Sequence, residues 1–272
     1  MKLEVLMSCM HQTDDRLVRA SGLTGDVVMI NQSNHNGYAE FPTAGGTVRL
    51  FSTTQRGLTK SRNMAIRESH AEICLLCDDD ETFEEDYQEK ILQAYRDLPQ
   101  ADILIFKIGN IPTRSFDDRI QQLRFPQTMK VCSVQISFRR QSLLDAGIFF
   151  DELLGAGTGN GAEEELKFLL DCQRAGLTIC YVPVQIASVA QNQSVWFDGF
   201  TEEFFENRGA TTRYILGAPL ASVYGLYYVL RKRTLYQTKI APGRALCAIF
   251  RGIFTNRIGK QAKAAKELEF FK

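Results

Sequence analysis

The stretch that most constrains this chain is an apolar run that ends directly in three carboxylates. Ile73–Cys77 is apolar throughout, and Asp78–Asp80 follows it without a break. Such a run is typical of a strand buried on both faces of a parallel sheet, and ligands of these sheets bind beyond the carboxyl ends of the strands. Neighbouring carboxylates repel one another, so a divalent cation that prefers oxygen ligands would stabilise them. The alternative is an acidic turn that caps a helix beginning near Phe83.

Apolar runs and helical patterns alternate around this stretch in the first 110 residues. We expect strands at 3–10, 26–31, 47–52, 72–77 and 102–108, helices at 59–69 and 83–98, and a polar loop at 32–46. This alternation predicts an α/β fold with a doubly wound, mostly parallel sheet.

The pattern is looser after residue 110. We expect a strand at 131–138, helices at 141–146 and 163–174, and a strand at 177–182 that ends at Pro183. The Gly-rich segment 155–161 lacks the Lys-Ser/Thr of a phosphate-binding P-loop, so we interpret it as a mobile loop that lets a substrate approach.

The last part of the chain is basic. Residues 207–266 contain 12 Lys or Arg and no Asp or Glu, whereas the first 206 residues contain 30 acids and 19 bases. Segments 220–230 and 244–258 have the pattern of amphipathic basic helices, which bind anionic membrane surfaces. Their apolar and aromatic content favours lipid over nucleic acid. Packing on the rest of the chain, or a homo-oligomer surface, is the alternative.

Cysteine usage and hydropathy predict the compartment. The seven Cys show no disulfide-type spacing, and Cys74 and Cys77 form a CxxC without a second pair, so zinc is not expected. No signal-peptide pattern is present, and no apolar run approaches the roughly 20 residues that span a bilayer. We therefore expect a cytoplasmic protein, held peripherally on the inner face of a bacterial membrane.

Three segments together resemble the family 2 glycosyltransferases. The first is Arg56–Ile66, which contains Arg62-Asn63, and the second is the apolar strand that ends in Asp78-x-Asp80. The third has acids three residues before Phe168 and a later strand that ends in Pro183. The resemblance covers about residues 3–190, and it is closest to enzymes of capsule, exopolysaccharide or lipopolysaccharide assembly.

The resemblance implies a GT-A fold and an inverting transfer of a sugar. The donor would be a nucleotide-sugar, commonly a UDP-sugar, and the acceptor a saccharide or a polyprenyl-linked saccharide. The implied catalytic domain is 1–206, with a nucleotide-sugar half at 1–110 and an acceptor half at 111–206. A basic helical extension would follow at 207–272.

The resemblance also assigns donor-binding residues. Asp78 would face the nucleotide, and Asp80 would bind Mn²⁺ or Mg²⁺ between the two phosphates with Asp78 as the second ligand. Asp79 would either contribute to donor binding or face away from the site. At the ends of the first two strands, Met10 and Asn31 would contact the base. The family often has an acid at the second of these positions.

The resemblance assigns three further positions, and two of them carry an alternative. Arg62 and Asn63 would line the nucleotide pocket, although Arg62 is equally suited to tying the fold together. Trp196 would stack on an acceptor sugar or lie in the core.

The catalytic base would be a carboxylate that accepts the proton of the acceptor hydroxyl. Counting back from Phe168 gives Glu165, with Glu164 as the second candidate. A helix N-terminus stabilises the charged carboxylate, while repulsion within Glu163–Glu165 opposes this. Alternatively, these acids are favourable first-turn residues of a surface helix.

Two rival functions fit parts of the same pattern. Asp78–Thr82 matches the DxDxT of haloacid-dehalogenase-type phosphatases, with Asp117–Asp118 as possible partner acids. The other rival is a non-catalytic module that binds a metal or docks on a membrane.

Overall fold

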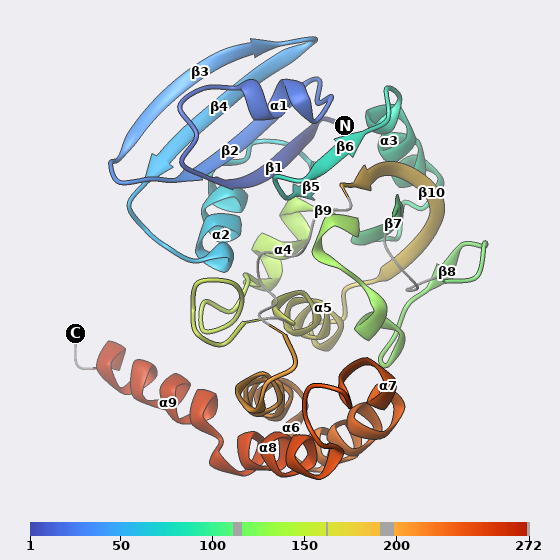
Figure 1. Cartoon of the computed structure of the whole chain (residues 1–272). Helices are drawn as coiled ribbons and strands as arrows, with labels where there is room; N and C mark the ends of the chain where they lie inside the picture. Colours follow the sequence, from blue (N-terminus) through green and yellow to red (C-terminus); the bar gives the residue numbers. More distant parts are fainter. Residues whose placement is uncertain (111–115, 162, 191–198, 271–272) are drawn as a thin grey trace. The chain divides into compact units, whose positions relative to one another are not determined.

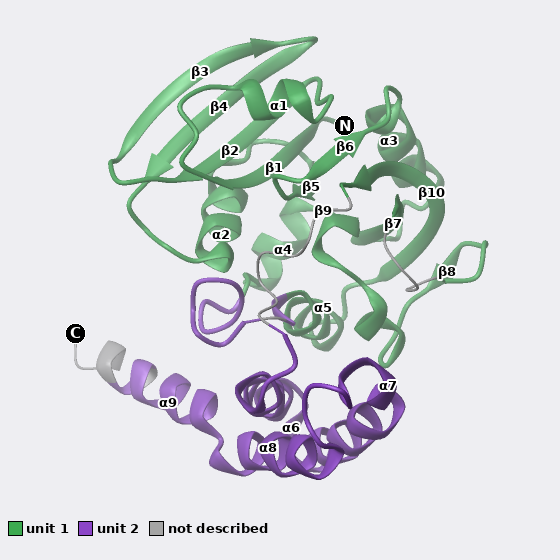
Figure 2. Ribbon diagram, in the orientation of Figure 1, with its two compact units in different colours: residues 1–150, 165–192 green, residues 151–164, 193–272 purple. Residues whose placement is uncertain are grey.

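The computed structural model describes residues 1–110, 116–161, 163–190 and 199–270. The chain divides into two compact units, which Figure 2 shows in different colours. Unit 1 consists of residues 1–150 and 165–192, and unit 2 of residues 151–164 and 193–272. The domain limits expected at 110 and 206 stay predictions.

Unit 1 is built on one mixed sheet (Figure 1). Its strands are β1 (Leu3–Met10), β2 (Asp26–Gln32), β3 (Gly37–Thr43), β4 (Gly46–Thr53), β5 (Ile73–Cys77), β6 (Glu81–Phe83), β7 (Ile103–Gly109), β8 (Gln121–Gln122), β9 (Ile136–Arg139) and β10 (Ile179–Val189). The order is β3-β4-β2-β1-β5-β9-β7-β10-β6, and β8 pairs with β10. Among these strands β4, β2, β1, β5, β7 and β10 run in one direction. The predicted, mostly parallel central sheet is confirmed.

Helices cover both faces of the sheet. They are α1 (Arg16–Ala20), α2 (Leu58–Glu68), α3 (Tyr87–Asp97), α4 (Arg140–Ala146) and α5 (Glu164–Arg174). Alternate residues of β1 enter two different cores, because successive side chains of a strand point to opposite faces. Val5 and Met7 pack in the core that contains Tyr87 of α3, whereas Leu6 packs in the core that contains Ile66 of α2 and Phe168 of α5. The doubly wound arrangement follows from this alternation.

The expected loop at 32–46 is wrong in its second half, because β3 forms an antiparallel hairpin with β4 there. β3 lies at the end of the strand order and is largely exposed, so it lacks the apolar run that marks a buried strand. Gly45 turns the chain with φ of +81°, and a Cβ on Gly46 would lie 2.3 Å from the backbone carbon of Gly25. An edge strand also tolerates Pro42, since its outer backbone groups need no partner.

The segment after the three carboxylates also differs from expectation. The helix predicted from Phe83 begins at Tyr87, and residues 81–83 form β6, which pairs with β10. Asp78–Asp80 therefore leads into a strand, and the alternative of an acidic turn that caps a helix near Phe83 is wrong.

Two strand predictions need correction. β10 does not end at Pro183 but continues to Val189, and its register with β7 shifts between Val182 and Gln185. A bulge accommodates a residue that cannot donate a ladder hydrogen bond. The expected strand at 131–138 is instead a 3₁₀ turn at Ser133–Gln135 followed by β9.

Unit 2 is helical in its C-terminal part. It contains α6 (Glu202–Arg231), α7 (Arg233–Tyr236), α8 (Pro242–Thr255) and α9 (Arg257–Phe270). The helices expected at 220–230 and 244–258 lie within this set, although α8 ends at Thr255, before Asn256, which adopts φ of 46°. α6 is kinked at Gly217, two residues before Pro219. Within the described ranges, none of the helices is both long enough and apolar enough to cross a bilayer.

Candidate active site

The predicted site begins at the carboxyl end of β5, where Asp78 is the first carboxylate. Its Oδ1 lies 2.9 Å from Nη2 of Arg62, and its Oδ2 lies 3.4 Å from Oγ of Ser133. The backbone N–H of Asp78 donates to Oε2 of Glu81 at 2.8 Å. The contacts with Arg62 and Ser133 orient the Asp78 side chain.

Of the two roles that were open for Arg62, the structure bears on the one that ties the fold together, and a contact with a nucleotide stays a prediction. Arg62 lies on α2 with 1 % of its surface exposed, and its guanidinium sits 5.4 Å from the ring centroid of Phe150. A buried guanidinium is costly unless it is paired, and Asp78 supplies the charge partner. Arg62 therefore ties α2 to the end of β5 and orients Asp78, one of the two predicted metal ligands.

Asn63 forms two hydrogen bonds with the backbone of Phe150. Its Nδ2 donates to the carbonyl oxygen at 2.9 Å, and its Oδ1 accepts from the N–H at 2.8 Å. Asn63 is buried, so these bonds give it a structural role. A contact between Asn63 and a nucleotide stays a prediction.

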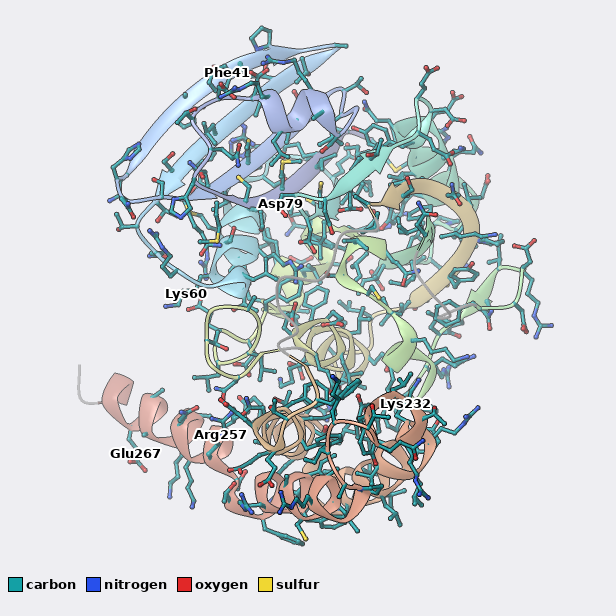
Figure 3. All side chains as sticks on the ribbon, viewed as in Figure 1. Phe41, Lys60, Asp79, Lys232, Arg257 and Glu267 are labelled. Atoms are coloured by element: carbon teal, nitrogen blue, oxygen red, sulfur yellow. The ribbon has the colours of Figure 1, made fainter. Side chains whose placement is uncertain are left out.

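Asp79 and Asp80 continue from Asp78 toward β6, and Figure 3 labels the first of them. Loss of solvent around the Asp79 carboxyl raises its pKa, and the charge of Asp78 raises it further. The pKa of Asp80 is raised by the same loss of solvent and by the charges of Asp78 and Asp79. In the described part of the chain, neither carboxylate has an ion-pair partner. The negative charge here is therefore only partly compensated.

Glu81 is a site residue that the sequence reasoning missed. It is 2 % exposed, and burial together with the charge of Asp78 raises the pKa of its carboxyl well above the ordinary value. Its Oε1 is buried and has no hydrogen-bond partner among the described residues. The signal in the sequence was a fourth acid directly after three others. The raised pKa favours the protonated form of Glu81, and a cation near it would oppose that shift.

These carboxyl groups have the donor chemistry that Mg²⁺ and Mn²⁺ prefer, and the unpartnered Oε1 of Glu81 adds a further oxygen beside them. Among the described residues, however, no three His, Cys, Asp or Glu side chains already converge on a common point. The carboxylate oxygens are therefore suitable ligands for Mg²⁺ or Mn²⁺, but these side chains would have to move closer together to bind the ion.

The ends of β1 and β2 lie at the same edge as the end of β5, because the three strands are adjacent and parallel. Met10 is the last residue of β1 and is exposed. Asn31 is buried near the end of β2, where its Nδ2 donates to the carbonyl oxygen of Gln12 at 2.6 Å and to Oγ of Ser52 at 3.0 Å. Asn31 thus holds the loop that follows β1. A direct contact with a base stays a prediction for Met10 and Asn31.

The three Glu near α5 have different environments. Glu163 precedes the helix with φ of 71°, and its Oε1 lies 2.6 Å from Nη1 of Arg208 in unit 2. Glu164, the first residue of α5, is buried, and Glu165 is half-buried in the first turn. The ring of Phe168 stacks on Phe150 with centroids 4.3 Å apart, which anchors α5 in unit 1. Glu163 is therefore committed to an ion pair, and Glu164 and Glu165 remain the candidate bases.

Trp196, the predicted acceptor-stacking residue, lies outside the described residues.

Comparison with known proteins agrees with the fold. Residues 34–148 match the protein-family model described as Glycosyl transferase family 2. No curated protein sequence matches this one. The structure of S. aureus TarS residues 1–349 in complex with UDP-GlcNAc has a TM-score of 0.63 at 16 % identity, covering 93 % of this chain and 82 % of that chain. The complex of the same TarS fragment with UDP has a TM-score of 0.59 at 14 % identity, covering 93 % and 81 %.

The family model covers β3 to the end of α4, and so includes β5 and the three carboxylates that follow it. The likeness to TarS extends the same fold over most of the chain. Residues 34–148 are therefore similar to the family 2 glycosyltransferases, and the chain shares the fold of the TarS structures.

Proposed function

We propose that this glycosyltransferase moves a sugar from a nucleotide-sugar, most simply a UDP-sugar, to a saccharide or lipid-linked saccharide, with inversion at the anomeric carbon. The observation that carries the proposal is the partly compensated acidic end of β5, at the same edge as the ends of β1 and β2. The UDP-GlcNAc and UDP in the TarS structures support a uridine nucleotide as the donor carrier.

Asp80 and Asp78 are the proposed ligands of Mn²⁺ or Mg²⁺. Such an ion, when bound, stabilises the negative charge that develops on the departing diphosphate. Arg62 holds the Asp78 side chain in place through an ion pair of 2.9 Å. Asp79, Asp80 and Glu81 lose a proton more easily once a cation offsets their mutual repulsion.

Glu165 is the proposed base. As the acceptor oxygen bonds to the anomeric carbon on the side opposite the diphosphate, the bond to the diphosphate breaks and the hydroxyl proton moves to the Glu165 carboxylate. The start of α5 favours the charged form of Glu165, whereas the adjacent Glu164 opposes it. Arg208 pairs with Glu163 and so removes one of the three charges from this repulsion.

The enzyme would encounter a lipid-linked acceptor at the surface of a membrane. We infer a peripheral position on an anionic bilayer, supported by the 12 Lys or Arg and the absence of acids in 207–266. The role of this enzyme would then be in the assembly of a surface polysaccharide.

Two substitutions separate the donor and acceptor parts of the proposal. Asp80→Asn should abolish Mn²⁺-dependent binding of a UDP-sugar in calorimetry, whereas Glu165→Gln should bind it normally and transfer sugar about 100- to 10,000-fold more slowly. Glu164→Gln is the comparison for the base, and Asp117→Asn is the matched control, since it removes an exposed acid paired only with Arg119 among the described residues. Transfer by Glu165→Gln at the wild-type rate would disprove the base assignment.

The same assays test the rival functions. Hydrolysis of phosphate monoesters without any nucleotide-sugar would support a phosphatase that uses Asp78 and Asp80. If Asp80→Asn and Glu165→Gln both leave activity unchanged, the acidic site is structural.

A further inference from the structure

The second half of α6 has an apolar face exposed to solvent. The kink at Gly217, with φ of 79°, separates this half from the first part of the helix. Its exposed side chains recur every three or four residues, with exposed fractions from 46 % at Leu226 to 69 % at Val223. These residues, which we call the α6 face, are Leu220, Val223, Leu226, Tyr227 and Leu230.

The opposite side of the second half of α6 is the side that packs against the rest of unit 2. Ala221, Gly225 and Val229 are buried. A Cβ on Gly225 would lie 3.3 Å from Cδ1 of Ile253 and 3.5 Å from Cδ1 of Ile249, so this side rests on α8. A surface helix normally turns charged residues to solvent once its apolar stripe is buried. Here the outward side is apolar as well. The packing of α6 on α8 does not explain this outward apolar side, so we ask what it contacts.

Basic residues lie at the end of the α6 face. Arg231, Lys232 and Arg233 follow Leu230 directly and are all exposed (Lys232 is labelled in Figure 3). No acid occurs between residues 207 and 266 to neutralise them. The surface therefore combines an apolar stripe, an amphipathic Tyr and a cluster of positive charge on about four turns of helix.

We propose that the α6 face lies in the headgroup region of an anionic bilayer, with its aliphatic side chains at the acyl boundary and Arg231–Arg233 among the lipid phosphates. This inference deepens the proposed use of a lipid-linked acceptor by naming the membrane-binding surface. Apolar area and electrostatic attraction add in interfacial helices, and neither alone gives firm binding.

Charge decides between a bilayer and a second copy of the chain. A symmetric pair of α6 faces would bring two basic clusters and no acid from this region, so the positive charges would remain uncompensated. An anionic lipid surface compensates the cluster of each copy and also accommodates the phenol of Tyr227 at its interface.

The test is flotation of the full-length protein with vesicles of phosphatidylglycerol and phosphatidylcholine, compared with phosphatidylcholine alone. The wild type should float with the anionic vesicles only, and less as salt rises. Val223→Glu should lower the partition coefficient about tenfold or more, because it replaces a membrane-facing apolar group with a charge. The triple change of Arg231, Lys232 and Arg233 to Gln should lower it about fivefold for each charge removed.

The matched controls make the same kinds of substitution at exposed residues of unit 1. Ile120→Glu adds the same charge at a similarly exposed apolar residue, and the triple change of Arg96, Arg119 and Arg124 to Gln removes three exposed bases. Both should float like the wild type, and all variants should keep the wild-type melting temperature, since the changed side chains are exposed.

Three results would overturn the proposal. They are failure of the wild type to float with anionic vesicles, equal loss in Val223→Glu and Ile120→Glu, and a wild-type dimer in light scattering that Val223→Glu converts to monomer. Donor binding by Val223→Glu is measured in parallel. If Val223→Glu binds the donor normally but no longer floats, the result supports membrane binding by the α6 face. If the wild type does not bind the donor, the proposed function is wrong, but the membrane-binding proposal is unaffected.

Discussion

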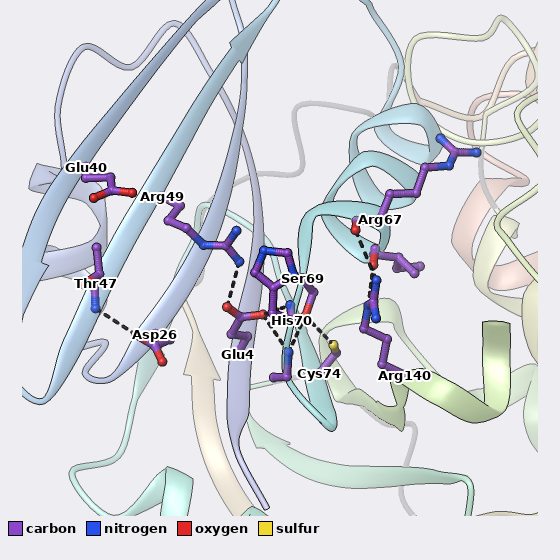
Figure 4. Close-up of polar contacts among 12 residues, drawn as sticks. Glu4, Asp26, Glu40, Thr47, Arg49, Arg67, Ser69, His70, Cys74 and Arg140 are labelled. Atoms are coloured by element: carbon purple, nitrogen blue, oxygen red, sulfur yellow. Dashed lines mark hydrogen bonds and ion pairs between the residues drawn. The ribbon is translucent and has the colours of Figure 1, made fainter.

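At the scale of single residues, Glu4 shows how a charge is accommodated inside the sheet. It lies in β1, and its Oε1 accepts from Nη2 of Arg49 at 2.8 Å (Figure 4). Its Oε2 accepts from the hydroxyl of Ser69 and from the N–H of His70 at 2.7 Å. Burial acts to raise the pKa of Glu4, but these hydrogen bonds and the Arg49 charge outweigh it and hold the pKa below 4.5.

A lowered pKa makes Glu4 a source of acid sensitivity. The stabilisation that it contributes is present above the unfolded-state pKa of about 4.5 and is lost as the pH falls through the lower pKa of the folded state. Glu4→Gln should lower the free energy of unfolding by about 2 kcal/mol at pH 7. Denaturation of the two proteins from pH 7 to pH 3 should show this difference shrinking below pH 4.5. A difference that stays constant over that range would contradict the role assigned to Glu4.

At this scale, the positions of the candidate site residues could be predicted from the sequence, but their contacts could not. The acids at the end of β5 were identified because an apolar run followed by charge is a local property of the chain. Their partners were not, because Arg62 lies 16 positions from Asp78 and Asn63 lies 87 positions from Phe150. Whether an Arg or Asn faces a ligand or the protein depends on such distant contacts.

At the scale of elements, α6 and α8 approach each other through glycines. A Cβ on Gly252 of α8 would lie 2.0 Å from the carbonyl oxygen of Glu206, and a Cβ on Gly209 of α6 would lie 2.0 Å from the carbonyl oxygen of Ile249. The two helix backbones can therefore be this close only because both positions lack a side chain.

Gly252→Ala should separate the two helices and lower the free energy of unfolding by about 1–3 kcal/mol, since the obstructing atom is backbone and cannot rotate away. The matched control is Gly243→Ala in the same helix, where no atom lies within 4 Å of the added Cβ. That variant should be as stable as the wild type or slightly more stable, because Ala favours helix. Chemical denaturation measures both, and equal stability of the two variants would disprove the close-contact role of Gly252.

At the scale of the whole molecule, unit 2 joins two stretches of chain that lie far apart in sequence. Arg208 of α6 pairs with Glu163, donates to the hydroxyl of Tyr224 at 3.0 Å, and lies between the rings of Phe204 and Tyr228. Tyr214 donates to Oδ2 of Asp151 at 2.6 Å. These contacts hold the loop before α5 against α6, within the same unit.

The Arg208–Glu163 pair should show strong non-additivity. Arg208→Met leaves the mostly buried Glu163 without its charge partner and should lower the free energy of unfolding by about 3–5 kcal/mol. Adding Glu163→Gln should recover part of this loss, because the unpaired charge is then gone. Arg251→Met, which breaks the more exposed pair with Glu206, is the control and should cost less than about 1 kcal/mol. A double variant less stable than Arg208→Met would contradict the pairing.

The sequence by itself determined the alternation of strands and helices, the buried β5 with its acidic end, the acids at the start of α5 and the basic helices of the tail. Each of these depends on neighbouring residues, since periodicity and charge runs are local. Tertiary structure alone decided that β3 pairs at the edge, that β10 passes through Pro183 by a bulge, and that Glu163 is neutralised by a residue 45 positions away. The physical reason is that an edge strand, a bulge and an ion pair are stabilised by partners whose positions only the folded chain defines.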